Sequence, residues 1–315
     1  MQLSDIQIAA NKINPFIHQT PLLSSKTLSK LVGGEVRLKA ENLQRAGAFK
    51  IRGALNKILS LTDQERSKGV VAFSSGNHAQ GVALAAKLLN LQATIVMPED
   101  AMELKVIATK AYGAEVVQSG VNAVTRSKVA AEIVEKTGSI MVPPFDDPFI
   151  VAGQGTIALE IFRDWSEVET IVVPLGGGGL SSGITLAATS INPKIRVYAV
   201  EPAAGNDGQE SLRTGKIVSI APPKTIADGA RTTAIGQIPF SILRERITDI
   251  VTVEDISLLS AIKLLALYSK LVVEPTGALA VAALLEGKIP QPSKTVAVLS
   301  GGNIAPEILA QALTS

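Results

Sequence analysis

The sequence predicts an α/β protein made of two open, twisted lobes, each a mostly parallel sheet covered by helices. Short apolar runs alternate with helical patterns from residue 69 onwards, and this alternation is typical of parallel sheets. Prolines at positions 143, 144 and 148 interrupt the alternation, and 315 residues is long for a single compact core. We therefore predict a larger domain formed by residues 1–65 and 147–315, with a smaller domain of residues 66–146 inserted into it.

The elements follow from apolar periodicity and from the residues that end each run. We expect a helix over 4–13, a second helix after Ser24 or Ser25, a strand over 35–39 and a helix that starts near Lys50. The smaller domain has predicted strands at 70–73, 93–97 and 115–117 and predicted helices at 77–89, 104–112 and 121–136. Beyond the prolines we expect strands at 170–173, 196–200, 249–253 and 295–299, helices at 155–162, 180–190, 255–269 and 276–285, a loop over 201–235 and a short final helix.

Composition narrows the class of function. The net charge of +2, with no basic run, is too small for a nucleic-acid footprint and indicates a small-molecule partner. The chain has no cysteine, which excludes thiol catalysis, thiolate metal sites and disulfides. We see no basic-then-apolar leader and no apolar run of membrane-spanning length, so we expect a cytoplasmic protein without a membrane partner.

One lysine occupies a special position. Lys50 follows Phe49 and an Ala-Gly-Ala turn, and it precedes apolar residues at helical spacing. The positive end of a helix dipole disfavours an ammonium group and favours a neutral amine, which is the form that a Schiff-base nucleophile needs. The alternative is an ordinary surface lysine whose stem packs on Phe49.

A run of four glycines, Gly176–Gly179, joins a predicted strand to a predicted helix. Glycines let the backbone wrap closely around a ligand, and the helix N-terminus adds positive charge, so the run predicts an anion site. The dinucleotide spacing fails because Ser181, Ser182 and Ile184 take the final-glycine positions, and the nucleotide-triphosphate loop fails because Ile184 replaces its lysine. We therefore expect this run to bind one phosphate group without magnesium. The alternative is a glycine turn that serves only for packing.

A second polar turn follows the strand at 70–73. Ser74, Ser75, Gly76, Asn77 and His78 open a helix there. Its backbone N–H groups suit a carboxylate, and its side chains add two hydroxyls, an amide and an imidazole. The alternative is a capped helix with a buried histidine.

Together, these motifs resemble the fold-type II pyridoxal-phosphate enzymes, which have the tryptophan synthase β-like fold with the active site between two lobes. The serine/threonine dehydratase and serine racemase group is the most similar. The resemblance spans nearly the whole chain and includes Gly153–Thr156, Thr225–Gly229, Val273–Gly277 and Ser300–Asn303. It implies pyridoxal 5'-phosphate (PLP) as cofactor.

The resemblance also implies residue roles. Lys50 would bind the cofactor covalently and act as general base, while Ser75 acts on the opposite face of the ring. The implied cofactor contacts are Phe49, Lys50, Asn77, Gly176, Gly177, Gly178, Gly179, Glu274 and Ser300. The implied substrate contacts are Ser74, Ser75, His78, Arg126 and Thr232, with Thr233 an alternative to Thr232. A serine that many relatives carry before the Phe-Lys pair is replaced here by Ala48.

Further expectations concern a metal and partners. Glu201, Gly205 and Asp207 match a divalent-metal loop of the group, and their oxygen ligands suit Mg²⁺, or Mn²⁺ or Ca²⁺. The resemblance implies a homodimer and leaves ATP as a candidate effector.

The function we predict is PLP-dependent β-elimination from L-serine or L-threonine, which gives a 2-oxo acid and ammonia. Such an ammonia-lyase would also carry serine racemase activity. One alternative is a 3-hydroxyaspartate dehydratase, in which Arg126 and Arg231 bind the second carboxylate. Another is a PLP-bound protein without catalysis, with a regulatory or metabolite-binding role. A nicotinamide dehydrogenase is disfavoured by the glycine spacing.

Overall fold

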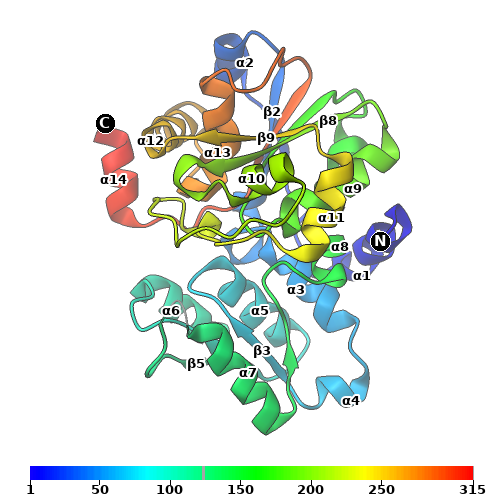
Figure 1. Cartoon of the computed structure of the whole chain (residues 1–315), viewed down its shortest axis with the longest axis vertical. Helices are drawn as coiled ribbons and strands as arrows, with labels where there is room; N and C mark the ends of the chain where they lie inside the picture. The colour runs from blue at the N-terminus through cyan, green and yellow to red at the C-terminus, as the bar shows by residue number, and fades with distance from the viewer. Residues whose placement is uncertain (123–124, 315) are drawn as a thin grey trace.

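Two sheets form the framework of the protein (Figure 1). The computed structural model describes residues 1–122 and 125–314. The larger sheet has the strand order β1-β2-β10-β7-β8-β9, and only the β1–β2 pair in it is antiparallel. The smaller sheet has the order β5-β4-β3-β6 and is parallel throughout. The strands are β1 (Leu22–Ser24), β2 (Val36–Ala40), β3 (Val70–Phe73), β4 (Ala93–Val96), β5 (Glu115–Val117), β6 (Ile140–Met141), β7 (Thr170–Pro174), β8 (Arg196–Pro202), β9 (Asp249–Val253) and β10 (Thr295–Leu299).

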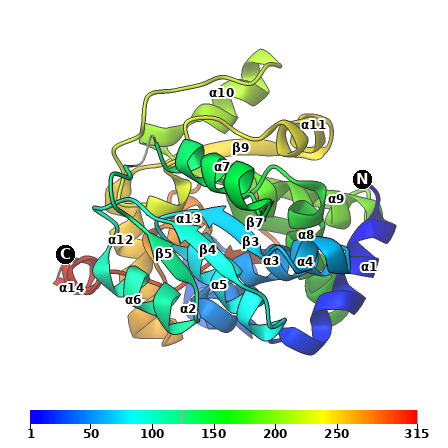
Figure 2. The ribbon, with the colours of Figure 1, turned by 90° about the horizontal axis from the view of Figure 1, so that it is seen from below.

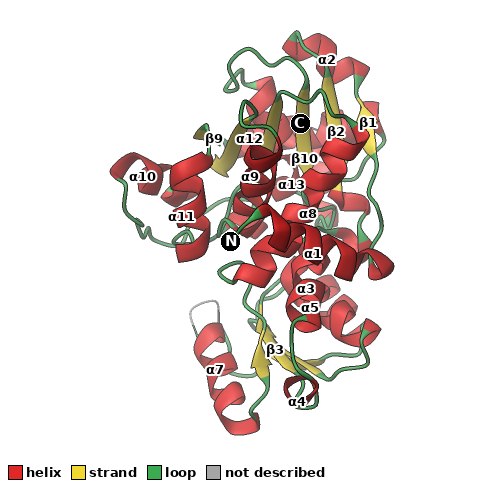
Figure 3. Ribbon diagram, turned by 90° about the vertical axis from the view of Figure 1, so that its right-hand side faces the viewer, coloured by secondary structure: helices red, strands yellow, loops and turns green. Residues whose placement is uncertain are grey.

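Helices cover both faces of each sheet, as the views in Figures 2 and 3 show. In the smaller lobe, α7 packs on one face and α5 and α6 on the other. None of the described helices is both long and apolar enough to cross a bilayer. The helices are α1 (Leu3–Ile13), α2 (Lys26–Val32), α3 (Lys50–Leu59), α4 (Asp63–Arg66), α5 (Asn77–Leu88), α6 (Glu103–Ala111), α7 (Arg126–Thr137), α8 (Pro148–Asp164), α9 (Gly179–Ile191), α10 (Asp207–Thr214), α11 (Gln237–Arg246), α12 (Asp255–Leu264), α13 (Pro275–Leu285) and α14 (Pro306–Thr314).

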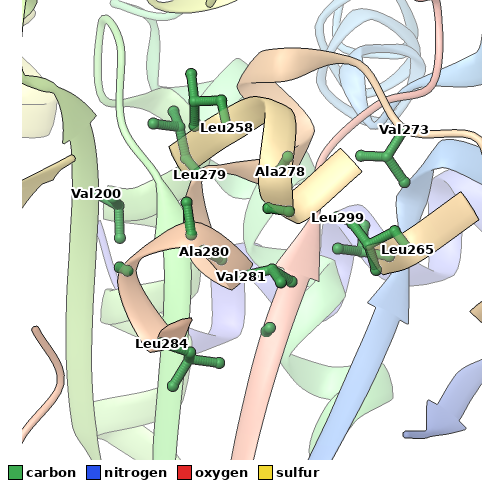
Figure 4. Close-up of a cluster of buried hydrophobic side chains, with 14 of the residues drawn as sticks. Val200, Leu258, Leu265, Val273, Ala278, Leu279, Ala280, Val281, Leu284 and Leu299 are labelled. Atoms are coloured by element: carbon green, nitrogen blue, oxygen red, sulfur yellow. The ribbon is translucent and has the colours of Figure 1, made fainter. Parts of the chain in front are cut away.

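Strand β7 lies inside the larger sheet and is buried along its whole length. Its Val172 joins the core beneath α12 and α13, whereas Ile171 and Val173 join the core beneath α8 and α9. Figure 4 shows the first of these cores, in which α13 lies against the larger sheet. Burial on both faces explains why the sequence shows an unbroken apolar run here in place of an alternating one.

Helix α3 lies where the two lobes meet. Its Ile51, Leu55 and Ile58 belong to the core of the smaller lobe, whereas Gly53 donates its N–H to Gln154 of α8 at 3.2 Å. The strands of the smaller sheet all lie between residues 70 and 141. The domain bounds of 1–65 with 147–315, and 66–146, stay our prediction.

Several helices differ from the expected ones. Helix α8 begins at Pro148, well before the expected start at 155, because Asp147 caps it by accepting from the N–H groups of Phe149 and Ile150 at 2.8 and 3.2 Å.

Helix α10 lies inside the expected 201–235 loop, and α11 follows that loop where no element was expected. The expected 255–269 helix becomes π-helical from Leu265 to Ser269. The expected 121–136 helix is described from Arg126, and residues 123 and 124 lie outside the described residues. Strands β1 and β6 and helix α4 were also not predicted.

A buried ion cluster anchors α3 to the larger lobe. The Arg52 guanidinium donates to Glu41 at 2.8 Å and to Glu160 at 2.6 Å, and Lys39 also donates to Glu160, at 2.5 Å. The side chains of Arg52, Glu41 and Lys39 have no exposed surface. Burial alone would raise the pKa of Glu41, but the charge and hydrogen bonds of Arg52 hold it below its usual value. The cluster therefore fixes the helix whose first residue is Lys50.

We expect Arg52→Ala to lower the free energy of unfolding by about 3 kcal/mol, because the buried Glu41 loses its ion-pair partner and Glu160 keeps only Lys39. Urea denaturation at equilibrium measures this. Arg163→Ala is the matched control, since Arg163 pairs with Asp164 at the surface and an exposed pair contributes less than about 1 kcal/mol. Equal losses in the two variants would contradict the role of the buried cluster.

Candidate active site

A cavity of about 710 Å³ lies between the two lobes. Strand ends from both sheets open into it, as is usual for ligand sites in parallel sheets. Its wall includes all the side chains and glycines that the sequence predicts for cofactor and substrate. They are Phe49, Lys50, Ser74, Ser75, Asn77, His78, Arg126, Gly176, Gly177, Gly178, Gly179, Thr232, Glu274 and Ser300.

Lys50 is the first residue of α3, and its amine faces this cavity. The Nζ atom donates to the carbonyl oxygen of Pro144 at 2.8 Å. Burial lowers the pKa of Lys50 to about 8, although the nearby Glu274 carboxylate opposes the shift. The sequence argument expected a lowered pKa from the helix dipole, and the structure adds desolvation by burial as a cause of a shift in the same direction. A buried amine of this kind is readily deprotonated and can act as nucleophile and base.

The glycine run forms a cradle at the end of β7. Gly178 has a φ of +92°, a conformation that favours glycine. A Cβ atom on Gly177 would lie 2.2 Å from the Phe145 ring, and one on Gly176 would lie 2.9 Å from the Gly229 carbonyl oxygen. Helix α9 starts directly behind, at Gly179. Only bare backbone fits here, and a helix N-terminus that faces a cavity suits a phosphate group.

The turn from Ser74 to His78 closes the opposite side. The Gly76 N–H donates to the Ser74 hydroxyl at 3.1 Å, and Arg126 donates to the Ser75 hydroxyl at 3.3 Å. Burial, opposed by the charge of Asp100, lowers the pKa of Arg126. The turn and the first residue of α7 therefore present two hydroxyls and a guanidinium to the cavity, which is a suitable surface for a carboxylate.

His78 is neutral in this environment. Burial and then the charge of Lys50 lower its pKa to about 3. Its Nε2 atom lies 2.9 Å from the Val142 carbonyl oxygen, and because a carbonyl only accepts, Nε2 carries the proton. Nδ1 is buried without a hydrogen-bond partner and is left as an acceptor. His78 can thus accept a hydrogen bond from a ligand but does not supply a positive charge.

Glu274 and Ser300 lie on the larger lobe. Glu274 accepts from the Asn77 side chain at 2.5 Å. Burial, with the charge of Asp228 in addition, raises the pKa of Glu274 to about 8. Ser300 follows β10, and its carbonyl oxygen accepts from the Phe49 N–H at 3.1 Å. This contact holds the serine beside the segment that carries Lys50.

Both threonines of the 232–233 pair line the cavity. The Thr232 hydroxyl oxygen is buried without a hydrogen-bond partner, whereas Thr233 is exposed and its carbonyl oxygen accepts from Ile220. A buried, unpartnered hydroxyl favours Thr232 as the ligand contact.

The cavity wall also contains residues that sequence reasoning missed. Lys105 of α6 pairs with Asp228 at 2.5 Å, which joins the two lobes across the cavity edge. Phe145 packs on the glycine cradle, and Asp146 accepts from the N–H groups that start α11 at 3.0 and 2.9 Å. Asp228 lies in the Thr225–Gly229 stretch that carries part of the family resemblance, but nothing in the sequence marked Lys105, Phe145 or Asp146.

The predicted metal residues lie outside this cavity. Glu201 is the second-last residue of β8, Gly205 lies in the next turn and Asp207 begins α10. Glu201 accepts from the N–H groups of Gly208 and Gln209, both at 2.9 Å. Neither oxygen of Asp207 has a hydrogen-bond partner of normal geometry. Within residues 1–122 and 125–314, no group of three or more His, Cys, Asp or Glu could hold a metal ion.

A buried amine and a glycine cradle line the same cavity. Together they can hold a cofactor that carries an aldehyde, which reacts with the amine, and a phosphate, which binds the cradle. That arrangement, between two α/β lobes, defines a PLP-dependent enzyme of fold type II. The chain belongs to the family described as pyridoxal-phosphate dependent enzymes, whose model matches residues 13–301.

Individual relatives are similar over nearly their full length. L-threo-3-hydroxyaspartate ammonia-lyase of Saccharomyces cerevisiae is 48% identical, over 95% of this chain and 92% of the relative. Serine racemase of Schizosaccharomyces pombe is also 48% identical, over 95% of this chain and 93% of the relative. The crystal structure of a threonine deaminase from T.th. has a TM-score of 0.92 and 46% identity, over 96% of this chain and 98% of that one.

Proposed function

We propose that the protein removes water from β-hydroxy amino acids, L-serine or L-threonine, to give a 2-oxo acid and ammonia, and that it also racemises serine. The observation that carries this proposal is the cavity that gathers Lys50, the glycine cradle and the Ser74–His78 turn. Relatives named for serine, threonine and 3-hydroxyaspartate support the substrate class.

Each group has a task that follows from its surroundings. Bound PLP supplies an electron sink that makes the proton on the substrate Cα labile. Lys50 takes this proton in its neutral form, and burial makes this form easier to reach by lowering the pKa of Lys50 to about 8. The Ser74 hydroxyl and the N–H groups of the Ser74–His78 turn hold the substrate carboxylate. The β-hydroxyl takes up a proton and leaves as water, which gives an enamine, and a water molecule then converts this enamine into the 2-oxo acid and ammonia.

Racemisation needs a second acid on the other face of Cα. We assign this role to Ser75, whose hydroxyl meets Arg126 in the cavity wall. A cationic neighbour makes loss of the hydroxyl proton easier.

A specific observation favours 3-hydroxyaspartate as the second candidate substrate. The Arg126 guanidinium lies on the cavity wall beside Ser75, and Arg231 lines the same cavity. A guanidinium pairs well with a second carboxylate.

A substrate panel tests the proposal. Keto-acid release is measured from L-serine, L-threonine and both diastereomers of 3-hydroxyaspartate, and the serine enantiomers are separated in parallel. Turnover of serine or threonine supports the first assignment, and turnover of hydroxyaspartate alone supports the second. A yellow protein that binds cofactor and turns over none of them would instead support a regulatory or metabolite-binding role.

We propose further that Glu201, Asp207 and the Gly205 carbonyl hold Mg²⁺, or Mn²⁺ or Ca²⁺. Burial, and for Glu201 the neighbouring Asp207, raise the pKa of Glu201 to about 8 and that of Asp207 to about 7. Two buried carboxylates that lie close enough to repel each other fit a metal site, because a bound cation would offset the cost of ionising them.

The metal proposal predicts a pH-dependent gain in stability. Folded-state pKa values raised above the unfolded ones mean that the metal-free protein loses stability as pH rises from the ordinary carboxyl values of 4.5 and 3.8 up to about 8 for Glu201 and about 7 for Asp207. Over that range the folded protein still holds protons that the unfolded chain has already released. The Tm gain on adding Mg²⁺ should therefore be larger above the raised pKa of Glu201 than below that of Asp207. Differential scanning calorimetry measures it, and Glu201→Gln should remove it. The same gain at both pH values would contradict the assignment.

A homodimer, an ATP effector and a cytoplasmic location also belong to the proposal. They rest on the family resemblance and on the composition. Light scattering with and without ATP tests the first two.

A further inference from the structure

The loop after β10 contains an asparagine that touches the segments on both sides of the cavity. Asn303 donates through one side-chain nitrogen to the Ala46 carbonyl oxygen and to the Asn77 side-chain oxygen, both at 2.8 Å. Ala46 lies four residues before Lys50, and Asn77 opens α5 in the other lobe. One amide group therefore connects the lysine segment, the substrate turn and the Ser300 loop.

The contact with Ala46 fixes which way the Asn303 amide points. A backbone carbonyl only accepts hydrogen bonds, so the NH₂ group of Asn303 must face Ala46. The second N–H of the same NH₂ group then donates a hydrogen bond to the Asn77 side chain, and only the oxygen of that side chain can accept it. The Asn77 amide is consequently turned with its nitrogen toward Glu274, to which it donates at 2.5 Å.

Glu274 does not decide this orientation by itself. Burial raises the pKa of Glu274 to about 8, and a neutral carboxyl group can donate as well as accept. With a neutral Glu274 and no contact to Asn303, either face of the Asn77 amide would find a partner. The orientation therefore depends on the chain of contacts that starts at the Ala46 carbonyl.

The backbone is shaped to bring Asn303 this close. Ala46 and Gly47 have φ values of +58° and +70°, and a Cβ atom on Gly47 would lie 2.5 Å from the Asn303 side-chain oxygen. Two backbone hydrogen bonds hold the loops together, from Gly302 to Gly47 at 2.8 Å and from Phe49 to Ser300 at 3.1 Å. An alanine with positive φ costs free energy, and in return the Ala46 carbonyl meets the Asn303 amide.

We propose that Asn303 is a positioning residue that holds the Asn77 amide with its N–H groups, and not its oxygen, directed at Glu274 and the cavity. The inference rests on the proposed function, and it places the implied cofactor contact of Asn77 at the ring oxygen of PLP. A donor at that place stabilises the ionised form of a phenolic oxygen. Asn303 thereby sets the protonation of the cofactor without touching it.

The test uses the cofactor-loaded protein and its absorption spectrum. Asn303→Asp keeps the shape of the side chain but cannot donate to Ala46 or Asn77, so the Asn77 amide turns and presents its oxygen to the cavity. We expect the visible band to lose intensity to a band at shorter wavelength, because the ring oxygen keeps its proton. The dissociation constant of PLP should rise about tenfold. Asn303→Ala, which leaves Asn77 free to take either orientation, should show a smaller change in the same direction.

Asn42→Asp is the matched control. Asn42 is buried close to Gly302 in the same region, and its side chain donates to the Val272 carbonyl oxygen at 3.1 Å. This variant loses a comparable hydrogen bond outside the chain of contacts and should leave the spectrum unchanged. An unchanged spectrum in both Asn303 variants, or an equal shift in Asn42→Asp, would overturn the inference. If the unaltered protein shows no cofactor band at all, the proposed function fails instead.

Discussion

Replacing Lys50 with alanine should leave a folded protein that releases keto acid about 10⁴-fold more slowly, because the chain loses both a nucleophile and a general base. Lys50 is the residue whose amine faces the cavity from the first turn of α3, and burial lowers its pKa to about 8. Keto-acid release from the preferred substrate of the panel measures the loss. The variant should also lose the covalent cofactor band while the glycine cradle still binds phosphate.

Lys57→Ala is the control for this prediction. Lys57 lies two turns further along the same helix and pairs with Asp147 at 2.6 Å, outside the cavity wall. Its removal costs an ion pair but leaves the cavity unchanged, so activity should stay within about threefold of the original protein. If Lys50→Ala retained as much activity as Lys57→Ala, the amine at position 50 would have no part in the reaction.

The sequence located the candidate site well because strand ends meet at one edge of each sheet. Ser74 follows β3, Gly176 follows β7 soon after its last residue, and Ser300 follows β10 directly. Residues that come after parallel strands gather at the carboxyl edge whatever the length of chain between them. Family resemblance then added Arg126, Thr232 and Glu274, which no local pattern marks, and all three line the cavity.

What the sequence missed depends on contacts between distant residues. The start of α11 is capped by Asp146, which is about ninety residues away in the chain, so no local capping signal marks that helix. The Lys105–Asp228 pair joins the two lobes and likewise has no local signal. Prolines 143 and 144 suggested a boundary, but Pro148 instead starts α8, where the missing N–H of proline is harmless.

The cause of the Lys50 pKa shift shows the same limit. The dipole argument uses only the position of Lys50 at a helix start, which the sequence reveals. The structure attributes the shift to burial between two lobes and to an opposing carboxylate, Glu274, more than two hundred residues away. Local sequence thus predicted the direction of the shift, and the tertiary structure adds burial as a cause that no local pattern reveals.

Replacing Ser75 with alanine should separate racemisation from elimination. We expect serine racemisation to fall about 10³-fold, since one of two opposed proton-transfer groups is lost. Elimination from L-serine should persist because Lys50 remains on its own face, whereas elimination from D-serine should fall together with racemisation. Chiral chromatography of serine and keto-acid assays on each enantiomer measure the three rates in one preparation.

Ser74→Ala separates this role from a change in the shape of the turn. The Ser74 hydroxyl accepts from the Gly76 N–H at 3.1 Å, so its loss disturbs the carboxylate site for both enantiomers alike. Ser74→Ala should therefore lower all three rates in parallel, while Ser75→Ala lowers two and spares one. Parallel losses in both variants would mean that Ser75 only shapes the turn, and the second proton would then have to come from another group on that face.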